Sequence, residues 1–474
     1  MFDEDTITAI STAPGVGAIA IVRVSGQRAF AILGEIFSER KNKTTVSDSK
    51  NNFVPESHRA YIGYIKDPLR EEKIVDEVVV VTYRGPNTYT GEDLVEINCH
   101  GSPVVTREIL NLVMTQGARL AEKGEFTKRG FLAGRLDLTQ AEAVLDVIHC
   151  KTERQSHLAL SVLQGHLGKR IKEIRSRLME LYTRIVAGID FPEEVGDLDL
   201  ADLEPIINES LQELRDLAET ARSGRFLRDG LKLAIIGRPN AGKSSLLNRL
   251  LNFERAIVTD IPGTTRDSIE EPVDIRGIPV VVIDTAGLRD TDDLVEKIGI
   301  ERTTRSAEEA DLTCILLDGT ATGPLAEESL MAERLKELAR PYFVAVNKSD
   351  LLDENSIAKI LDEKIIAGSL GEPTIISALS GDGIEAFKDV IENFALFDNS
   401  RKEISASLNE RQGALCLKSV ESLSRLAESA QAGLPQDCLA SDLRLAVDAL
   451  DAISGQVVTE EILTEVFANF CIGK

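Results

Sequence analysis

The sequence lacks the long apolar segments that mark membrane proteins. A helix that crosses a bilayer needs about 18 or more apolar residues in succession, and no stretch of the 474 residues approaches that length. The N-terminal segment Met1–Asp5 is acidic where an export signal would be basic. We therefore expect a cytoplasmic protein with no membrane association.

Cysteine is also scarce. None of the six cysteines belongs to a Cys-x-x-Cys pair, so we expect reduced thiols rather than disulfides or a zinc site. The C-terminal Cys471 lies four residues from the end, as in a prenylation box, but Gly473 and the terminal Lys474 fit such a box poorly. The cysteines are Cys99, Cys150, Cys314, Cys416, Cys438 and Cys471.

Positive charge is in deficit. The sequence has 54 Lys and Arg against 78 Asp and Glu, a net charge of −24. Because neutralisation of phosphates dominates affinity for nucleic acids, this balance argues against a nucleic-acid partner unless a local basic face exists. The stretch Lys169–Arg177 is the candidate for such a face, and a solvated helix surface is the alternative.

Four segments differ in their apolar patterning, and the length exceeds what one hydrophobic core supports. Residues 1–134 mix short apolar runs with Gly and Pro, which indicates an α/β or α+β unit. Residues 135–229 and 396–474 have helical spacing, whereas residues 230–395 alternate strands and helices. We predict a nucleotide domain with a mostly parallel sheet, inserted into a helical domain whose two halves pack together.

The same patterns predict individual elements. One apolar face is expected from Leu160 through Leu167 to Ile185, and another from Leu439 to Leu450. The polar stretch 41–52 is expected to be a loop. The predicted strands are 18–22, 78–81, 233–236, 280–283, 314–317, 343–346 and 374–376, and the predicted helices are 104–114, 203–227 and those within 141–189.

A phosphate-binding loop follows the strand predicted at 233–236. Gly237-Arg238-Pro239-Asn240-Ala241-Gly242-Lys243-Ser244 matches the pattern of Gly, four residues, then Gly-Lys-Ser/Thr, and it opens a helix predicted at Ser245–Leu251. The glycines let backbone N–H groups surround the phosphates, and the helix N-terminus adds partial positive charge. Lys243 is expected to bridge the β- and γ-phosphates, and the Ser244 hydroxyl to bind magnesium.

Two further strand ends complete a guanine-nucleotide site. In the segment Asp284-Thr285-Ala286-Gly287, Asp284 would reach magnesium through a water molecule and the Gly287 N–H would sense the γ-phosphate. Asn347-Lys348-Ser349-Asp350 selects the base, because the Asp350 carboxylate can accept both the N1–H and the 2-amino group of guanine. After the last strand, a backbone N–H of Ser377-Ala378 can meet the guanine 6-oxygen.

The residue that orients the attacking water in Ras-like enzymes is missing. A glutamine follows Asp-x-x-Gly in those enzymes, whereas Leu288 stands here and cannot hydrogen-bond water. Glu296 is a candidate replacement, and a surface acid near Asp290, Asp292 and Asp293 is the alternative. The segment 259–267 is a candidate mobile loop, one of whose threonines should complete the magnesium shell.

These motifs, with Asn240 and the terminal Phe470–Lys474, closely resemble the MnmE (TrmE) family of bacterial and organellar tRNA-modification GTPases. The resemblance covers the whole chain. Its other landmarks are 19–26, 89–93, Pro103, 124–127 and 136–143. It implies that the N-terminal domain binds a tetrahydrofolate derivative (5-formyl or 5,10-methylene) and mediates homodimerisation. Arg23, Glu96, Arg135 and Lys474 fall at the folate-contacting positions, with Arg135 replacing the usual lysine, which keeps the charge but changes its geometry.

The resemblance further implies potassium-dependent GTP hydrolysis with dimerisation of the nucleotide domains. Asn240, Thr259, Ile261 and Thr264 would hold potassium. Thr265 would complete the magnesium shell, and Glu296 would orient the water.

By the same resemblance, the chain works with a flavin-containing partner, MnmG (GidA), in a heterotetramer. Together they would add an aminomethyl or carboxymethylaminomethyl group at C5 of the wobble uridine of certain tRNAs. The alternative is a ribosome-assembly or regulatory GTPase switch without one-carbon chemistry, which would have no need of Arg23, Glu96, Arg135 and Lys474.

Overall fold

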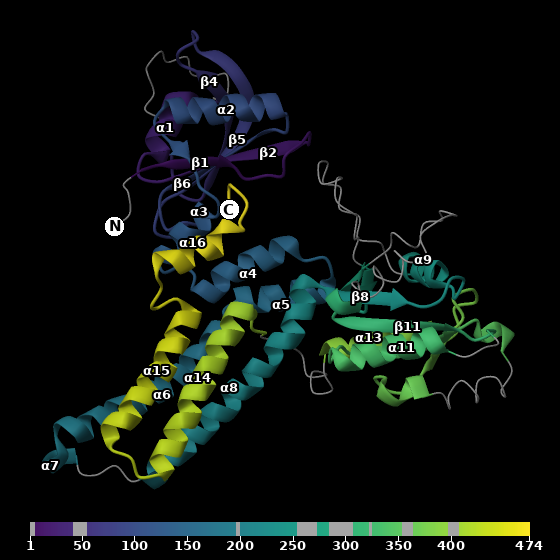
Figure 1. The fold of residues 1–474 in the computed structure, drawn as a ribbon. Coiled ribbons are helices and arrows are strands. Elements are labelled where there is room, and N and C mark those ends of the chain that lie inside the picture. Colours follow the sequence, from purple (N-terminus) through teal and green to yellow (C-terminus); the bar gives the residue numbers. More distant parts are fainter. Residues whose placement is uncertain are drawn as a thin grey trace. The chain divides into compact units, whose positions relative to one another are not determined.

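The computed structural model describes residues 5–40, 55–195, 200–253, 273–283, 307–321, 325–352, 364–396 and 407–474. They belong to two compact units (Figure 1). The first comprises Met1–Leu145, Gly168–Lys172 and Leu450–Lys474, and the second comprises Asp146–Leu167 and Glu173–Ala449. The predicted loop 41–52 lies outside the described residues.

The first unit is built on a sheet with strand order β3-β4-β5-β6-β2-β1-β7. Its neighbouring strands are antiparallel except β1 and β7, so of the two arrangements left open it is α+β. The elements are β1 (Ile7–Ile10), β2 (Ile19–Ser25), α1 (Ala29–Ile36), β3 (Phe37–Glu39), β4 (Arg59–Asp67), β5 (Lys73–Tyr83), β6 (Leu94–His100), α2 (Pro103–Thr115), β7 (Arg119–Leu120), α3 (Glu125–Leu132), α4 (Leu138–His149) and α16 (Glu460–Ala468).

Strand alternation places Arg23 and Glu96 together. Ala20, Val22 and Val24 of β2 are buried in the core that α1 and α2 share with the sheet. Since side chains alternate along a strand, Arg23 points to the opposite face. It stands directly across from Glu96 of β6 in the antiparallel register.

The C-terminal residues pack in this first unit. Lys123 forms an antiparallel bridge with Ile472, and the Phe126 N–H donates to the Lys474 carbonyl at 3.2 Å. Gly473 has φ +98°, and a Cβ there would collide with the Ile10 carbonyl oxygen. Glycine is therefore required at position 473 for the tail to reach this place.

Long helices form one part of the second unit. They are α5 (Glu153–Leu163), α6 (His166–Asp190), α7 (Pro192–Val195), α8 (Leu200–Asp229), α14 (Glu410–Gln431) and α15 (Gln436–Ser454). Of these, α6 contributes Gly168–Lys172 and α15 contributes Leu450–Ser454 to the first unit. Leu167, Ile174, Leu178, Leu181 and Ile185 of the expected face are buried, but Leu160 at its start is 40% exposed. The reason is Gly165, whose φ of +88° ends α5 and starts α6 in a new direction. Arg177, at the end of the basic stretch, is paired with Glu213 at 2.8 Å. No helix in the described part of the chain has the length and apolar character needed to span a bilayer.

The other part of the second unit is a sheet with order β13-β12-β11-β8-β10-β9, in which only β9 runs antiparallel to its neighbour. This confirms the predicted mostly parallel sheet. Its elements are β8 (Leu231–Ile236), α9 (Lys243–Phe253), β9 (Val273–Ile275), β10 (Ile278–Ile283), β11 (Leu312–Asp318), α11 (Ala326–Glu337), β12 (Tyr342–Asn347), the 3₁₀ turns Ser349–Leu351 and Lys364–Gly368, β13 (Thr374–Ile375) and α13 (Ile384–Leu396).

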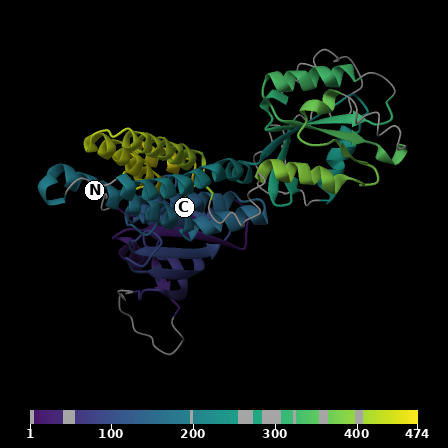
Figure 2. The ribbon, with the colours of Figure 1, turned by 90° about the horizontal axis from the view of Figure 1, so that it is seen from below.

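Both faces of this sheet are covered (Figure 2). Leu233 of β8 packs in a core with α9 and α13, whereas Ala234 and Ile236 of the same strand pack in a second core with α11. Burial on both faces explains the near-continuous apolar runs in the sequence. The carboxyl ends of β8, β11, β12 and β13 consequently meet at one edge, where ligands bind in such sheets.

Candidate functional site

The predicted phosphate loop connects β8 to α9. The helix begins at Lys243, two residues before the predicted start, so the lysine and Ser244 are in its first turn. Asn240 has a left-handed φ of +65°. Gly242 has φ +97°, and a Cβ there would collide with the Asn347 side chain. The loop can therefore close around phosphates only with glycine at position 242.

Lys243 is directed back over the loop. Its Nζ donates to the Gly237 carbonyl at 2.8 Å and to the Arg238 carbonyl at 3.0 Å. These contacts hold the ammonium group against the first two carbonyls of the loop. Ser244 and Ser245 are both exposed in the first turn of α9.

Asn347 joins three strand ends. Its amide Nδ2 donates to the Ala241 carbonyl at 2.7 Å, and its Oδ1 accepts from the Ala378 N–H at 2.9 Å. The Asn347 residue is only 2% exposed. A buried polar side chain with both ends satisfied holds its neighbours firmly. The structure thus brings together the phosphate loop, the base-selecting loop and Ser377-Ala378, as the strand pattern predicts.

The base-selecting loop is fixed from both sides. Ser377 Oγ donates to Asp350 Oδ1 at 2.6 Å, which leaves the exposed carboxylate its second oxygen for a ligand. On the other side, Lys348 Nζ donates to Asp318 Oδ2 at 2.6 Å. Partial burial acts to raise the pKa of Asp318, but the bonds from Lys348 and Thr320 hold it below its usual value.

Sequence reasoning missed Asp318. The signal available was its place at the end of β11, since it lies beside Asn347 in the parallel register with β12.

Several predicted site residues lie outside the described residues. They are Thr259, Ile261, Thr264, Thr265, Asp284, Thr285, Ala286, Gly287 and Glu296. The described strand β10 runs parallel to β8 and ends at Ile283, the residue before Asp284 in the sequence.

In the first unit, three of the four predicted folate residues are close together. Arg23 Nε and Nη2 donate to Glu96 Oε1 at 3.0 and 2.7 Å, and Arg23 Nη1 donates to the Gly473 carbonyl at 3.3 Å. Burial lowers the pKa of Lys474, and the positive charge of Arg23 lowers it further. This group therefore places the cations Arg23 and Lys474 beside the Glu96 carboxylate.

Arg135 is connected to this group through Tyr89, which sequence reasoning did not single out as a binding residue. The Arg135 guanidinium lies 4.5 Å from the Tyr89 ring centroid, and the Arg23 guanidinium lies 5.2 Å from it. Cations at these distances are attracted to the ring face. Tyr89 was visible in the sequence only as part of a family landmark.

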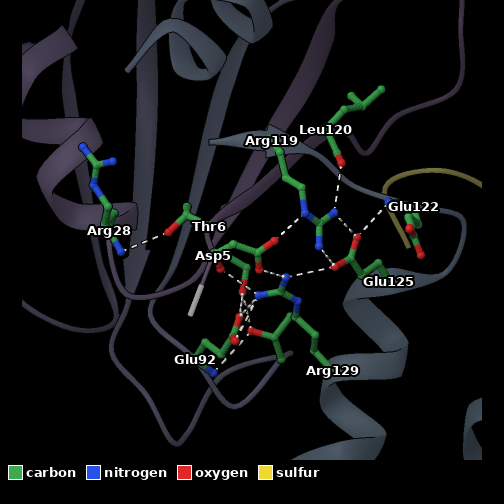
Figure 3. A network of polar contacts seen from close by, with 11 residues as sticks. Asp5, Thr6, Arg28, Glu92, Arg119, Leu120, Glu122, Glu125 and Arg129 are labelled. Atoms are coloured by element: carbon green, nitrogen blue, oxygen red, sulfur yellow. Dashed lines mark hydrogen bonds and ion pairs between the residues drawn. The ribbon is translucent and has the colours of Figure 1, made fainter. Parts of the chain in front are cut away.

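A buried charge cluster supports the same region (Figure 3). Arg129, 5% exposed, donates to Asp5 at 2.7 Å, to Glu92 at 3.1 Å and to Glu125 at 2.9 Å. Arg119 donates to both Glu125 oxygens at 2.6 and 2.8 Å. Burial acts to raise the pKa of Glu125, but these arginines and the Glu122 N–H lower it to about 2. Glu125 begins α3, whose Phe126 N–H holds the Lys474 carbonyl.

We predict that Glu125→Gln destabilises the first unit at pH 7 by on the order of 3 kcal/mol. This is the free energy that corresponds to lowering the pKa of Glu125 from 4.5 to about 2. A depressed carboxyl pKa stabilises the fold above the unfolded value of 4.5, and that contribution is lost as the pH falls towards about 2. Urea unfolding of the full chain, with hydrogen exchange of residues 119–132 as the local probe, measures the difference.

The difference in the free energy of unfolding between wild type and Glu125→Gln should therefore become smaller in acid. Glu122→Gln is the matched control, because only the Glu122 backbone bonds to Glu125 and its side chain is exposed. Equal stability of Glu125→Gln and wild type at pH 7 would refute the prediction.

Comparisons with known proteins give the same family along the whole chain. The family model described as the MnmE helical domain matches residues 138–471, and the model described as the GTP-binding protein TrmE N-terminus matches residues 6–135. A curated relative from Clostridioides difficile (strain 630), named tRNA modification GTPase MnmE, is 43% identical over 479 aligned residues, which cover 100% of both chains. A relative with the same name from Thermoanaerobacter pseudethanolicus is 44% identical and covers 99% of each chain.

Among solved structures, an Era variant from Aquifex aeolicus with GDP and aluminium fluoride is 25% identical. That match covers 40% of this chain and 66% of the other, with a TM-score of 0.27, and the assignment does not depend on it. The family assignment rests instead on the two family models and on the full-length sequence identity to the curated relatives. The chain belongs to the MnmE (TrmE) family of tRNA modification GTPases.

Proposed function

We propose that the chain hydrolyses GTP to GDP and phosphate at the edge of the parallel sheet, and that this cycle drives modification of tRNA. The proposal rests on the hydrogen bonds of the Asn347 side chain, which link the phosphate loop to Ala378. Beside them, the exposed Asp350 carboxylate accepts one bond, from Ser377, and could accept others from a base. Asp350 would accept the N1–H and 2-amino group of guanine. The Ala378 N–H donates to Asn347 Oδ1 and the Ser377 N–H donates to the Asp382 carbonyl, so one of the two would have to leave that partner to meet the 6-oxygen.

Magnesium and potassium fit the donors available. Ser244 is exposed at the start of α9, where a hydroxyl can bind magnesium beside the β-phosphate, and Thr265 would supply a second ligand. Asn240, with Thr259, Ile261 and Thr264, would supply oxygens to potassium. These ions would neutralise the charge that develops on the phosphates during hydrolysis. Lys243 would add its own charge, and Glu296 would orient the water across a dimer of nucleotide domains.

The pocket around Arg23 would hold a tetrahydrofolate derivative, 5-formyl or 5,10-methylene. Glu96 would accept hydrogen bonds from the pterin edge, which presents donors like those of guanine. Arg23, Arg135 and Lys474 would pair with the carboxylates of the glutamate tail. The one-carbon unit would contribute to an aminomethyl or carboxymethylaminomethyl group at C5 of the wobble uridine.

The working assembly would be a homodimer that pairs with the flavoprotein MnmG (GidA) in a heterotetramer and receives tRNA. We divide the chain for this purpose into a folate-binding and dimerisation domain (1–134), a helical domain (135–229 and 396–474) and an inserted nucleotide domain (230–395).

We predict that Arg23→Met weakens binding of 5-formyltetrahydrofolate by the full chain by about 10- to 100-fold. The reason is that one or two charge-assisted hydrogen bonds are lost while the side-chain stem remains. Isothermal titration calorimetry measures the change. Arg59→Met is the matched control, because Arg59 is also ion-paired, to Glu56 at 2.7 Å, and lies 5.6 Å from the Tyr61 ring. Equal weakening in both variants would count against the folate pocket.

The whole proposal is tested by nucleoside analysis of tRNA from cells that lack this protein. The modified wobble uridine should disappear and should return when the wild-type chain is supplied. An unchanged nucleoside profile would refute the coupling to tRNA.

A further inference from the structure

Glu328 is a buried carboxylate beside the phosphate loop, and the motifs do not account for it. It lies in the first turn of α11 and is only 5% exposed. Its Oε1 lies 2.8 Å from Arg238 Nε, whereas its Oε2 is buried with no hydrogen-bond partner among the residues that the structure describes. A buried carboxylate costs several kcal/mol unless a cation compensates it, and the guanidinium of Arg238 is the cation paired with Glu328 here.

Arg238 is the second residue of the phosphate loop, and its two ends face different partners. Its side chain reaches Glu328, while its backbone carbonyl accepts from Lys243 Nζ at 3.0 Å and from the Ala241 N–H at 3.2 Å. The Arg238 side chain is 30% exposed, whereas the Glu328 side chain on α11 is only 5% exposed. The ion pair with Glu328 therefore restrains the residue whose carbonyl accepts from Lys243.

We propose that Glu328 is a positioning residue for the phosphate loop: through Arg238 it holds the loop in the shape that presents Lys243 to the phosphates. This deepens the proposed GTPase function and rests on it. The pair also has an electrostatic consequence. Without Arg238, an uncompensated negative charge would be buried beside the site of a polyanionic ligand, which would weaken nucleotide binding further.

The test is a double-mutant cycle on the full chain, with the GDP dissociation constant and GTP turnover as readouts. Glu328→Ala should weaken GDP binding by about 10-fold and raise KM while kcat changes little, since the loop is misplaced but the hydrolytic groups remain. Glu328→Gln keeps an oxygen acceptor for Arg238 and should stay within about 3-fold of wild type. Glu327→Ala is the matched control, because Glu327 is exposed in the same helical turn.

The arginine side of the cycle separates positioning from general stability. Arg238→Ala should weaken GDP binding more than Glu328→Ala does, and the double variant should return to the Glu328→Ala level, because removing the carboxylate removes the unpaired charge. Additive losses, or GDP binding by Glu328→Ala equal to that of wild type, would overturn the proposal. A wild-type chain that binds no GDP would instead refute the proposed function itself.

Discussion

Asp350→Asn should lower the affinity for GTP by about 10²- to 10⁴-fold, because two charge-assisted hydrogen bonds to guanine are worth roughly 1.5–3 kcal/mol each. The asparagine amide presents a donor where guanine also has donors. Xanthine carries an oxygen in place of the 2-amino group, so the same substitution should improve binding of xanthosine triphosphate. Competition titrations with the two nucleotides on the full chain measure the exchange of preference.

The surroundings of Asp350 make this substitution a clean test. Asp350 is exposed and accepts one bond, from Ser377 Oγ at 2.6 Å, so an asparagine can keep that bond through its carbonyl oxygen. Asp382→Asn is the control, since Asp382 is another exposed aspartate that accepts from a serine, Ser380, at 2.7 Å in the adjoining loop. GTP affinity that is unchanged in Asp350→Asn would remove Asp350 from base recognition.

Glu296→Ala should reduce GTP turnover by about 10²- to 10⁴-fold. This is the usual contribution of a side chain that orients the attacking water or accepts a proton from it. Nucleotide binding should survive, because the residues assigned to binding are elsewhere in the chain. Single-turnover hydrolysis in potassium, together with a GDP titration, separates the two effects.

Asp292→Ala is the control for Glu296→Ala, as an acid from the same stretch of sequence. Normal turnover in Glu296→Ala would show that another group orients the water. A wild-type rate that is the same in sodium as in potassium would remove the potassium site from the scheme.

The arrangement of the described part of the candidate nucleotide site could be predicted because its parts are short motifs at strand ends. The glycine spacing fixed the phosphate loop, and burial on both faces explains why β8 and β12 could be read from apolar runs. The predicted helix start at Ser245 missed Lys243 because the first turn of a phosphate-loop helix coincides with the end of the motif.

Contacts between residues far apart in the sequence were not predictable. Glu328 and Arg238 are 90 positions apart in number, and only packing of α11 against the sheet brings them together. Tyr89 likewise could not be identified as a site residue from the sequence, because its contacts with Arg23 and Arg135 depend on the fold. The apolar spacing in the sequence continues from Leu160 to Ile185, but the helix itself does not. Gly165 has a left-handed backbone conformation, which separates two helices without disturbing the apolar spacing.

The claim that the strand ends of the parallel sheet form one guanine-nucleotide pocket is tested most directly by nucleotide competition. A fluorescent GDP analogue bound to the purified full-length chain should be displaced by GTP and by GDP, but not by ATP at about 100-fold higher concentration, given the selectivity that Asp350 provides. Displacement by ATP as readily as by GTP, or no binding of the analogue at all, would contradict the account.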